Sequence, residues 1–153
     1  MQNLVALVIV CGAILMVFIL GGRLALFSDF YGGLFLFLFT YSATVIAFGS
    51  QGLYKSVIGL RYLFVNDIAQ TPASEFLAII LKKQISFIYG GASLALLIGS
   101  VSIFSSAEAL ASTTVIYNAF AINIIIILYA AIFSEGLLRP LPTKLEKRLS
   151  TIK

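Results

Sequence analysis

The stretch ISFIYGGASLALLIGSVSIFSS, Ile85 to Ser106, decides the fold class of this chain because it carries no charged side chain. A helix of about 20 apolar residues crosses the hydrocarbon core of a bilayer, so the stretch predicts a transmembrane helix. It also contains several glycines and serines. Small and weakly polar residues in a membrane helix indicate a surface against which another helix packs.

The composition extends this prediction to the whole chain. Hydrophobic residues make up 61% of the 153 positions and charged residues 10%, with a mean hydropathy of +1.09. Soluble domains are about half apolar and about a quarter charged. The chain is therefore expected to be a single transmembrane domain over residues 1–153 that contacts the lipid bilayer and no nucleic acid.

Three further uncharged apolar runs have the length of membrane spans. An isolated strand cannot cross lipid, because its backbone polar groups would lack partners, so even the alternating run LFLFLFTY at Leu34–Tyr41 is expected to be helical. The predicted fold class is all-α, a polytopic membrane protein with four transmembrane helices. The spans are expected over residues 4–20, 33–48, 85–104 and 113–134.

The basic residues predict the orientation of these spans. Of the ten Lys and Arg residues, all but Arg23 lie between the second and third spans or after the fourth. The positive-inside rule places that side in the cytoplasm, so both termini are expected to be cytoplasmic. The cytoplasmic parts are then a link over residues 49–84 and a basic tail over residues 139–153.

The cytoplasmic link carries helix signals of its own. In QGLYKSVIGLRYLF, residues 51–64, apolar residues recur at helical spacing and predict an amphipathic continuation of the second span. VNDIAQ reads as a turn. Thr71 as N-cap and Pro72 at the first helical position then predict one long helix that reaches Phe104.

The end of the fourth span is predicted from its prolines. Pro140 and Pro142 are expected to stop the span, because proline lacks the backbone N–H that a helix interior uses. TKLE, residues 143–146, predicts a capping box at the start of a short basic tail helix.

The third span carries two patterns of small residues. Gly91, Ala95 and Gly99 are four apart and allow two helix backbones to approach closely. They predict helix packing, either against the chain's own second or fourth span or between subunits. A neighbouring stripe predicts either internal packing or a mildly polar lining that faces a partner helix; its members are Ser86, Gly90, Ser93, Leu97 and Ser100.

Two asparagines lie in the fourth span, where an amide without a partner is costly. Asn118 is near the predicted outer end and can meet lipid headgroups. Asn123 is deeper, and it predicts either an interhelical hydrogen bond or a group on a wet pathway.

The predicted spans contain no carboxylate, histidine or lysine. A proton relay or ion site in a membrane normally includes such a group, so this chain is not expected to carry protons alone. A single cysteine, Cys11, excludes a disulfide framework and a Cys/His metal site. Without a nucleophile–base pair or a nucleotide-binding motif, the chain is expected to be no enzyme and to hold no cofactor.

Several segments resemble the A subunit of bacterial flagellar stators, the MotA/PomA type within the MotA/TolQ/ExbB proton-channel superfamily. The first link and the exit of the second span are matched by LGGRLALFSDF (Leu20–Phe30) and FGSQGLYKSVIGLRYLF (Phe48–Phe64). LIGSVSIFSS (Leu97–Ser106) is similar to the outer half of the third span. LYAAIFSEGLLRPLPTKLEKR (Leu128–Arg148) resembles the exit of the fourth span.

The resemblance implies a homo-oligomeric ring in the bacterial inner membrane. In that family five A subunits surround two B-type subunits (MotB/ExbD/TolR-like), each with one transmembrane helix that bears an aspartate. Protonation of that aspartate, or sodium binding to it, drives rotation, and the third and fourth spans of A line the central hole. Pore- or partner-facing residues would then be Ser86, Gly90, Ser93, Ser100, Asn118 and Asn123.

Some positions depart from the family pattern. Tyr89 stands where the family has a proline, and Leu96 stands where it has a hydroxyl residue. Ile126 and Ile127 replace a threonine pair that is associated with ion passage. These departures argue against sodium, and the short cytoplasmic link lacks the head that pushes on a flagellar rotor.

The leading prediction is thus a ring subunit of an ion-driven rotary membrane motor outside the flagellum, with protons as the expected ion. One alternative is a structural or assembly subunit that keeps the ring fold and conducts nothing. Another is a small four-span exporter, which would need a carboxylate within the membrane.

Overall fold

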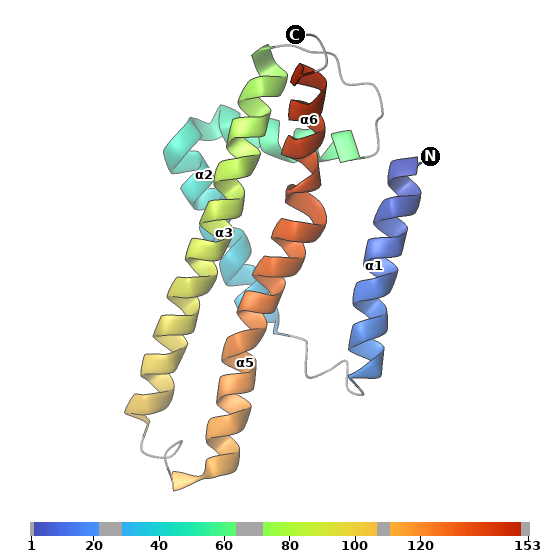
Figure 1. The fold of residues 1–153 in the computed structure, drawn as a ribbon. Helices are drawn as coiled ribbons and strands as arrows, with labels where there is room; N and C mark the ends of the chain where they lie inside the picture. The colour runs from blue at the N-terminus through green and yellow to red at the C-terminus, as the bar shows by residue number, and fades with distance from the viewer. Residues whose placement is uncertain (1, 22–28, 64–71, 107–110, 151–153) are drawn as a thin grey trace.

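The computed structural model describes residues 2–21, 29–63, 72–106 and 111–150, and these segments are almost entirely helical (Figure 1). No strand occurs within them, which confirms the all-α prediction. The predicted turn VNDIAQ and the N-cap Thr71 lie outside the described residues. In chain order the elements are α1 (Gln2–Leu20), α2 (Phe30–Gly59), the 3₁₀ turn η2 (Leu60–Leu63), α3 (Pro72–Ser105), α5 (Thr113–Ala131), the π-helical segment η3 (Ile132–Leu138) and α6 (Pro140–Ser150).

Three helical stretches are long and apolar enough to cross a membrane, namely Phe30–Tyr62, Ala73–Ser105 and Thr113–Glu146. They agree with the prediction of a membrane protein. α1 contributes a shorter apolar helix, Val8–Leu20. It packs against η3, where a Cβ on Gly136 would lie 3.9 Å from the Val10 side chain.

α2 begins at a cap and bends at a glycine. The Asp29 side chain accepts a hydrogen bond of 3.0 Å from the backbone N–H of Gly32, which satisfies one of the free donors at the helix start. Gly49 has a φ of 70° and a ψ of 179°, a conformation that only glycine adopts at little cost. The bend separates the predicted second span from its predicted helical continuation.

The continuation of α2 is helical as predicted, but it buries a different face. Gly52, Ser56 and Gly59 are buried, while Tyr54 and Val57 are 69% and 49% exposed. Glycine at 59 is required by a close approach, since an added Cβ would lie 2.7 Å from the methyl carbons of Leu77 on α3. Small residues let the segment lie directly on α3, and Tyr54 and Val57 lie on its exposed side.

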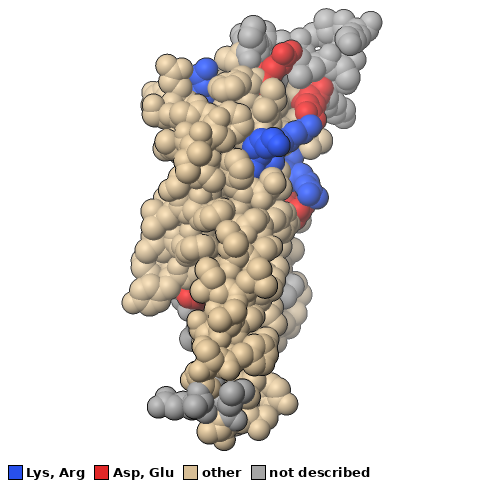
Figure 2. All heavy atoms as spheres, turned by 90° about the vertical axis from the view of Figure 1, so that its left-hand side faces the viewer, with Lys and Arg blue, Asp and Glu red and all other residues tan. Residues whose placement is uncertain are grey.

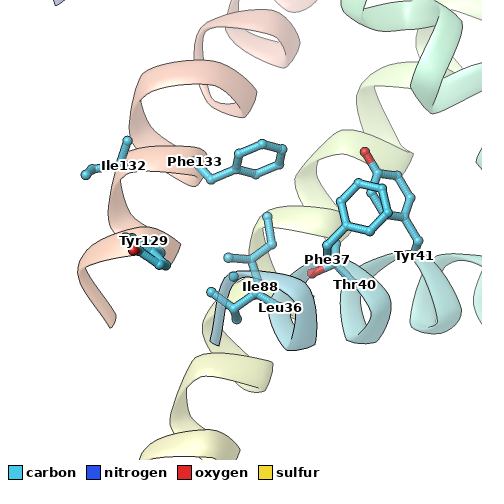
Figure 3. Close-up of a pocket in the computed structure, with 9 residues that line it drawn as sticks. Leu36, Phe37, Thr40, Tyr41, Ile88, Tyr129, Ile132 and Phe133 are labelled. Atoms are coloured by element: carbon cyan, nitrogen blue, oxygen red, sulfur yellow. The ribbon is translucent and has the colours of Figure 1, made fainter. Parts of the chain in front are cut away.

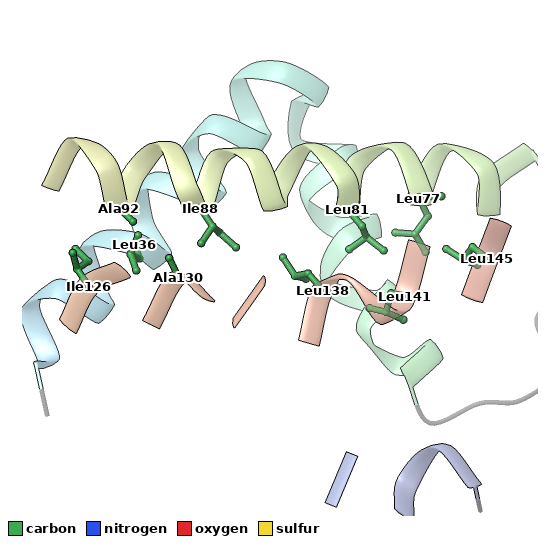
Figure 4. Packing of buried hydrophobic residues seen from close by; sticks show 11 residues of the cluster. Leu36, Leu77, Leu81, Ile88, Ala92, Ile126, Ala130, Leu138, Leu141 and Leu145 are labelled. Carbon is green, nitrogen blue, oxygen red and sulfur yellow. The ribbon is translucent and has the colours of Figure 1, made fainter. Parts of the chain in front are cut away.

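α3 is the central helix of the bundle. Its 34 residues begin at Pro72 as predicted, with Glu75 in the first turn. At about 1.5 Å per residue it is roughly 50 Å long, so it extends well beyond a hydrocarbon core of about 30 Å. One side of α3 packs on the other helices through a continuous apolar cluster (Figure 4); its members include Leu36, Leu77, Leu81, Ile88, Ala92, Ile126, Ala130, Leu138, Leu141 and Leu145.

The prediction that prolines stop the fourth span is wrong. α5 continues through η3 into α6, and the backbone N–H of Arg139 donates to the carbonyl of Ser134 at 2.8 Å, the spacing of a π-helix. Pro140 then occupies the first position of α6, where a missing N–H costs little. The wider π turn therefore accommodates the proline without ending the helix.

The predicted capping box at residues 143–146 is also wrong, because α6 has already begun at Pro140. The Thr143 hydroxyl donates to the carbonyl of Arg139 at 3.0 Å, one turn earlier in the helix. The Glu146 carboxylate forms a salt bridge with Lys82 of α3 instead of a cap. Thr143 and Glu146, which the local sequence pattern assigned to helix initiation, thus make other contacts in the folded chain.

A buried amide joins both halves of α2 to α3. Gln84 is 3% exposed, and its Nε2 donates to the hydroxyl of Thr44 at 3.1 Å and to that of Ser56 at 3.0 Å. Thr44 precedes the bend at Gly49 and Ser56 follows it. Both hydroxyls donate in turn to backbone carbonyls, of Thr40 and of Leu53. This hydrogen-bond network around Gln84, a residue of α3, therefore fixes the angle of the bend in α2.

Charged side chains gather toward one end of the bundle, above a long surface that is largely free of charge (Figure 2). The starts of α1 and α3 and the end of α6 lie toward that same end (Figure 1). Lys144 of α6 donates to the carbonyl of Tyr62 at 3.0 Å, and Lys55 lies 5.0 Å from the centre of the Phe76 ring. These contacts tie the basic end together.

Candidate functional site: the uncharged face of α3

The exposed side of α3 holds part of the predicted partner-facing stripe. Ser86, Gly90 and Ser93 are exposed, and Leu97 beside them is 62% exposed. A Cβ added at Gly90 would meet nothing within 4 Å. The Ser93 hydroxyl donates to the carbonyl of Tyr89 at 2.8 Å, so it is satisfied within its own helix. The result is an uncharged strip on the side of α3 that the other described residues leave exposed.

Ser100, at the C-terminal end of the stripe, turns toward α5 and contacts Asn123. The Nδ2 of Asn123 donates to the carbonyl of Leu96 at 3.0 Å and to the Ser100 hydroxyl at 3.1 Å. Ser100 donates to the same carbonyl at 2.7 Å. In the described chain, Asn123 thus makes the interhelical hydrogen bonds that were one of its two predicted roles. Asn118 lies apart from this group and is exposed on α5.

The glycines of the small-residue motif face inward, toward the chain's own helices. A Cβ on Gly91 would lie 2.7 Å from the Phe39 ring of α2, and a Cβ on Gly99 would overlap the Asn123 amide of α5. Ala95 is partly buried and packs against the central apolar cluster. The motif therefore sits back to back with the exposed stripe on the same helix.

The positions that depart from the stator pattern differ in burial and in their hydrogen bonds. Ile126 is 5% exposed and belongs to the core, whereas Ile127 is 37% exposed. The carbonyl of Leu96 accepts the hydrogen bonds of Ser100 and Asn123. Tyr89 is partly buried, and its hydroxyl donates to the Glu135 carboxylate at 2.9 Å.

The contact between Tyr89 and Glu135 is a feature that the sequence did not reveal. The predicted fourth span ends at residue 134, just before Glu135, but the helix continues past this residue to Glu146. Arg139, one turn on, pairs with the carboxylate at 2.7 Å. Tyr89 lies about 10 Å along α3 from Lys82, toward the uncharged part of the bundle. The charge of the Glu135 carboxylate, which lies beside the stripe, is therefore balanced by Arg139 of the same helix.

The described residues contain no group of three or more His, Cys, Asp or Glu side chains that could hold a metal ion. The arrangement can offer a partner a smooth surface of glycine, serine and aliphatic carbon. Its chemistry is that of helix association.

A matched pair of glycine substitutions tests this division of α3 into two faces. Gly99→Ala should destabilise the isolated chain by about 1–3 kcal/mol, because the new methyl displaces the Asn123 amide and leaves this partly buried group without its hydrogen bonds. Gly90→Ala should stabilise it by up to about 1 kcal/mol through helix propensity. Chemical unfolding in detergent micelles, followed by circular dichroism, measures both. Equal effects of the two substitutions would contradict the assignment of faces.

Comparison with known proteins finds no matching family model, no similar curated protein and no similar solved structure. The fold and the site by themselves define a class: an all-helical membrane protein in which one uncharged face of α3 is exposed in the described residues.

Proposed function

We propose that this chain is a MotA-like ring subunit that surrounds the transmembrane helices of a B-type partner. The partner supplies the ionisable aspartate, and the complex couples ion flow, with protons as the ion, to mechanical work outside the flagellum. In this proposal α1 is a fourth span, both termini are cytoplasmic and the complex lies in a bacterial inner membrane. The resemblance in the segments quoted above supports it, together with the basic residues on one side.

The observation that carries the proposal is the exposed stripe of Ser86, Gly90 and Ser93 on α3. A helix that faces lipid gains nothing from small residues, whereas a helix that receives another helix needs them for close approach. The opposite side of α3 is already filled by α2, α5 and α6. Among the described residues the stripe is left exposed, so it can receive a helix from another protein.

The electrical neutrality of this surface fits a guest that brings its own charge. Glu135 is paired with Arg139 and hydrogen-bonded by Tyr89. A partner aspartate that moves past such a wall would meet no strong trap of opposite charge. A closed ring also satisfies head-to-tail contacts between identical subunits.

Co-expression tests the proposal directly. The chain is produced with a single-span membrane protein that has an intramembrane aspartate, and the purified material is reconstituted in liposomes for a proton-flux assay. We expect a complex with several copies of this chain per partner dimer, and flux that is lost when the partner aspartate becomes asparagine. Failure of the two co-expressed proteins to purify as a complex, or selective cation flux through the chain alone, would contradict the proposal.

The substitution Glu135→Gln tests whether this surface of the chain only surrounds the partner or also takes part in ion conduction. Because the ion site belongs to the partner, we expect this substitution to keep at least about half of the proton flux of the complex. The matched substitution of the partner aspartate should remove nearly all of it. If Glu135→Gln abolishes flux while the complex still assembles, the chain itself contributes an ionisable group to the path.

A second candidate is a structural or assembly subunit that keeps the ring arrangement and conducts nothing. The hydrogen bonds of Ser93, Ser100 and Asn123 favour it, since all three side chains are satisfied within this chain. Such a subunit would bind its partner through the same stripe on α3, but the complex would show no proton flux in the liposome assay.

A further inference from the structure

After its bend, α2 turns across the bundle instead of running along it (Figure 1). A Cβ added at Gly52 would lie 3.8 Å from the Ile80 side chain, and one added at Gly59 would lie 2.7 Å from that of Leu77. Between these two contacts the chain advances about 10 Å along α2 but only about 4.5 Å along α3. The crossing segment, residues 51–63, is therefore steeply inclined to α3.

The crossing segment begins where α2 has the length of one membrane span. Gly49 lies about 28 Å along the helix from Phe30, which is close to the thickness of a hydrocarbon core of about 30 Å. No charged residue occurs between these two positions. A cavity of about 280 Å³ beside this first half has almost wholly apolar walls, and its lining includes Phe37, Thr40 and Phe133 (Figure 3). The first half of α2 therefore suits hydrocarbon, and the bend comes at the boundary of the core.

α3 places the boundary of the hydrocarbon core at the same level. The crossing segment contacts α3 between Leu77 and Gln84, and the exposed side chains of Lys82 and Lys83 lie within that interval. Beyond Gln84, α3 carries no charged residue as far as its end at Ser105. Lysines near the end of a membrane helix extend their ammonium groups to the headgroups. Both helices thus place the crossing segment at the level of the headgroups.

The exposed side chains of the crossing segment are those of a helix that lies at a membrane surface. Tyr54, Val57 and Arg61 are exposed. Tyrosine is enriched at this level because it combines an apolar ring with a polar hydroxyl. Lys55 is exposed on the flank toward the start of α3, where its Nζ lies 5.0 Å from the centre of the Phe76 ring. The segment therefore offers the headgroup layer aromatic, aliphatic and basic side chains together.

The positive charges of Lys55 and Arg61 are not balanced by a carboxylate. Neither residue forms a salt bridge with another described residue, whereas Lys82 of α3 pairs with Glu146 of α6. Both contact aromatic rings instead, and the Arg61 guanidinium lies 5.2 Å from the centre of the Tyr62 ring. A cation over a ring keeps its charge, so both residues can bind an anion from outside the chain. At the level of the headgroups that anion is a lipid phosphate.

We propose that the crossing segment lies in the headgroup layer of the membrane and that Lys55 and Arg61 bind the phosphates of anionic phospholipids. Tyr54 and Val57 then lie between the headgroups and the first carbons of the acyl chains. The bend at Gly49 and the hydrogen bonds of Gln84 hold the segment at this angle. This inference concerns the lipid-facing side of α2, and it does not rest on the partner proposed for α3.

Spin labels measure the depth of the segment in the full chain, reconstituted in nanodiscs of mixed phosphatidylcholine and phosphatidylglycerol. Leu38, exposed about 12 Å along α2, is the reference for hydrocarbon, and Glu75, exposed in the first turn of α3, is the reference for water. A label at Val57 should show a ratio of oxygen to water-soluble nickel-chelate accessibility between those of the two references. A ratio equal to either reference, or a label that neither reagent reaches because protein covers it, would overturn the proposal.

Native mass spectrometry of the full chain tests the lipid contacts, because it gives dissociation constants for individually bound phosphatidylglycerol and phosphatidylcholine. We expect phosphatidylglycerol to bind more tightly. Lys55→Gln and Arg61→Gln should each weaken its binding about fivefold, the contribution of one basic residue at an anionic membrane surface. Binding of phosphatidylcholine should not change. Lys55→Arg keeps the charge and should retain the affinity of the wild type.

The matched control removes a charge that is already paired. Lys82→Gln combined with Glu146→Gln leaves the net charge unchanged, so it should not alter the affinity for phosphatidylglycerol. Two results would show that Lys55 and Arg61 do not bind lipid phosphate. One is wild-type affinity for phosphatidylglycerol in the double variant Lys55→Gln/Arg61→Gln, and the other is an equal loss of affinity in the control.

Discussion

Gly90→Leu should abolish co-purification of the partner and leave the isolated chain as stable as the wild type. A Cβ at this position meets nothing within 4 Å, so the isolated fold has room for the larger side chain. Leucine is also a better helix former than glycine by nearly 1 kcal/mol. If the exposed stripe receives a transmembrane helix, however, the same side chain forces the two backbones apart.

The expected size of this effect follows from overpacking. Adding a large side chain to a filled contact costs about 1–3 kcal/mol, which corresponds to roughly 5- to 150-fold in affinity at each contact. In a ring every subunit carries the substitution, so the losses accumulate. Quantitative co-purification from co-expressing cells, with size-exclusion chromatography of the complex, measures the effect.

A second glycine provides the matched control. Gly12 on α1 is also exposed and has nothing within 4 Å of an added Cβ. Because the third and fourth spans, and not α1, line the central hole of the proposed ring, Gly12→Leu should leave the complex intact. Gly90→Ala should also retain the partner, since it keeps the surface small. Normal complex yield from Gly90→Leu would remove the stripe as the partner surface and with it the main support for the proposed function.

Gln84→Ala should destabilise the chain by about 3 kcal/mol and loosen the bend in α2. The substitution removes the amide that holds Thr44 and Ser56, which lie on opposite sides of Gly49. Two hydrogen bonds of about 1 kcal/mol each are lost, and a small cavity remains in the core. Gln84→Leu keeps the volume, so it should cost only about 1–2 kcal/mol.

Unfolding and distance measurements separate the two consequences. The free energy of unfolding is measured in micelles by circular dichroism. Double electron–electron resonance between spin labels at Val57 and Ile79, both exposed, reports the position of the second half of α2 on α3. We expect a broader distance distribution in Gln84→Ala than in the wild type.

Thr40→Val is the control for the hydrogen-bond network around Gln84, because it removes a hydroxyl that is buried like that of Thr44 but has no partner. It should change neither the stability nor the distance distribution to any marked extent. Thr44→Val, by contrast, should cost about 1–2 kcal/mol, since Thr44 both donates and accepts. Similar costs for the two threonine substitutions would show that Gln84 does not organise the bend.

Much of the helical architecture was predictable because long uncharged runs have few alternatives in lipid. The start of α3 at Pro72 and the helical second half of α2 followed from capping and periodicity, which are local signals. The wrong predictions came from local sequence rules that other interactions in the folded chain override. At Pro140 a π turn absorbed the proline, and at residues 143–146 the side chains bonded to α3 and to the preceding turn instead of forming a cap.

The candidate site was predictable only in part, since a stripe of small residues does not say which side of it is occupied. Gly90 and Gly91 are neighbours in sequence, yet one is open and the other lies against Phe39. The partnership of Tyr89 with Glu135 joins residues far apart in the chain, and neither residue carries a motif that points to the other.

The sequence by itself determined that this chain is helical and membrane-embedded and where most of its helices run, because apolar length and backbone satisfaction in lipid depend on composition alone. The tertiary structure decided which face of α3 is buried, how Gln84 sets the bend at Gly49, and that Thr40 is left unpaired beside a cavity. Those features depend on the distances between helices, which the order of residues along one helix does not encode.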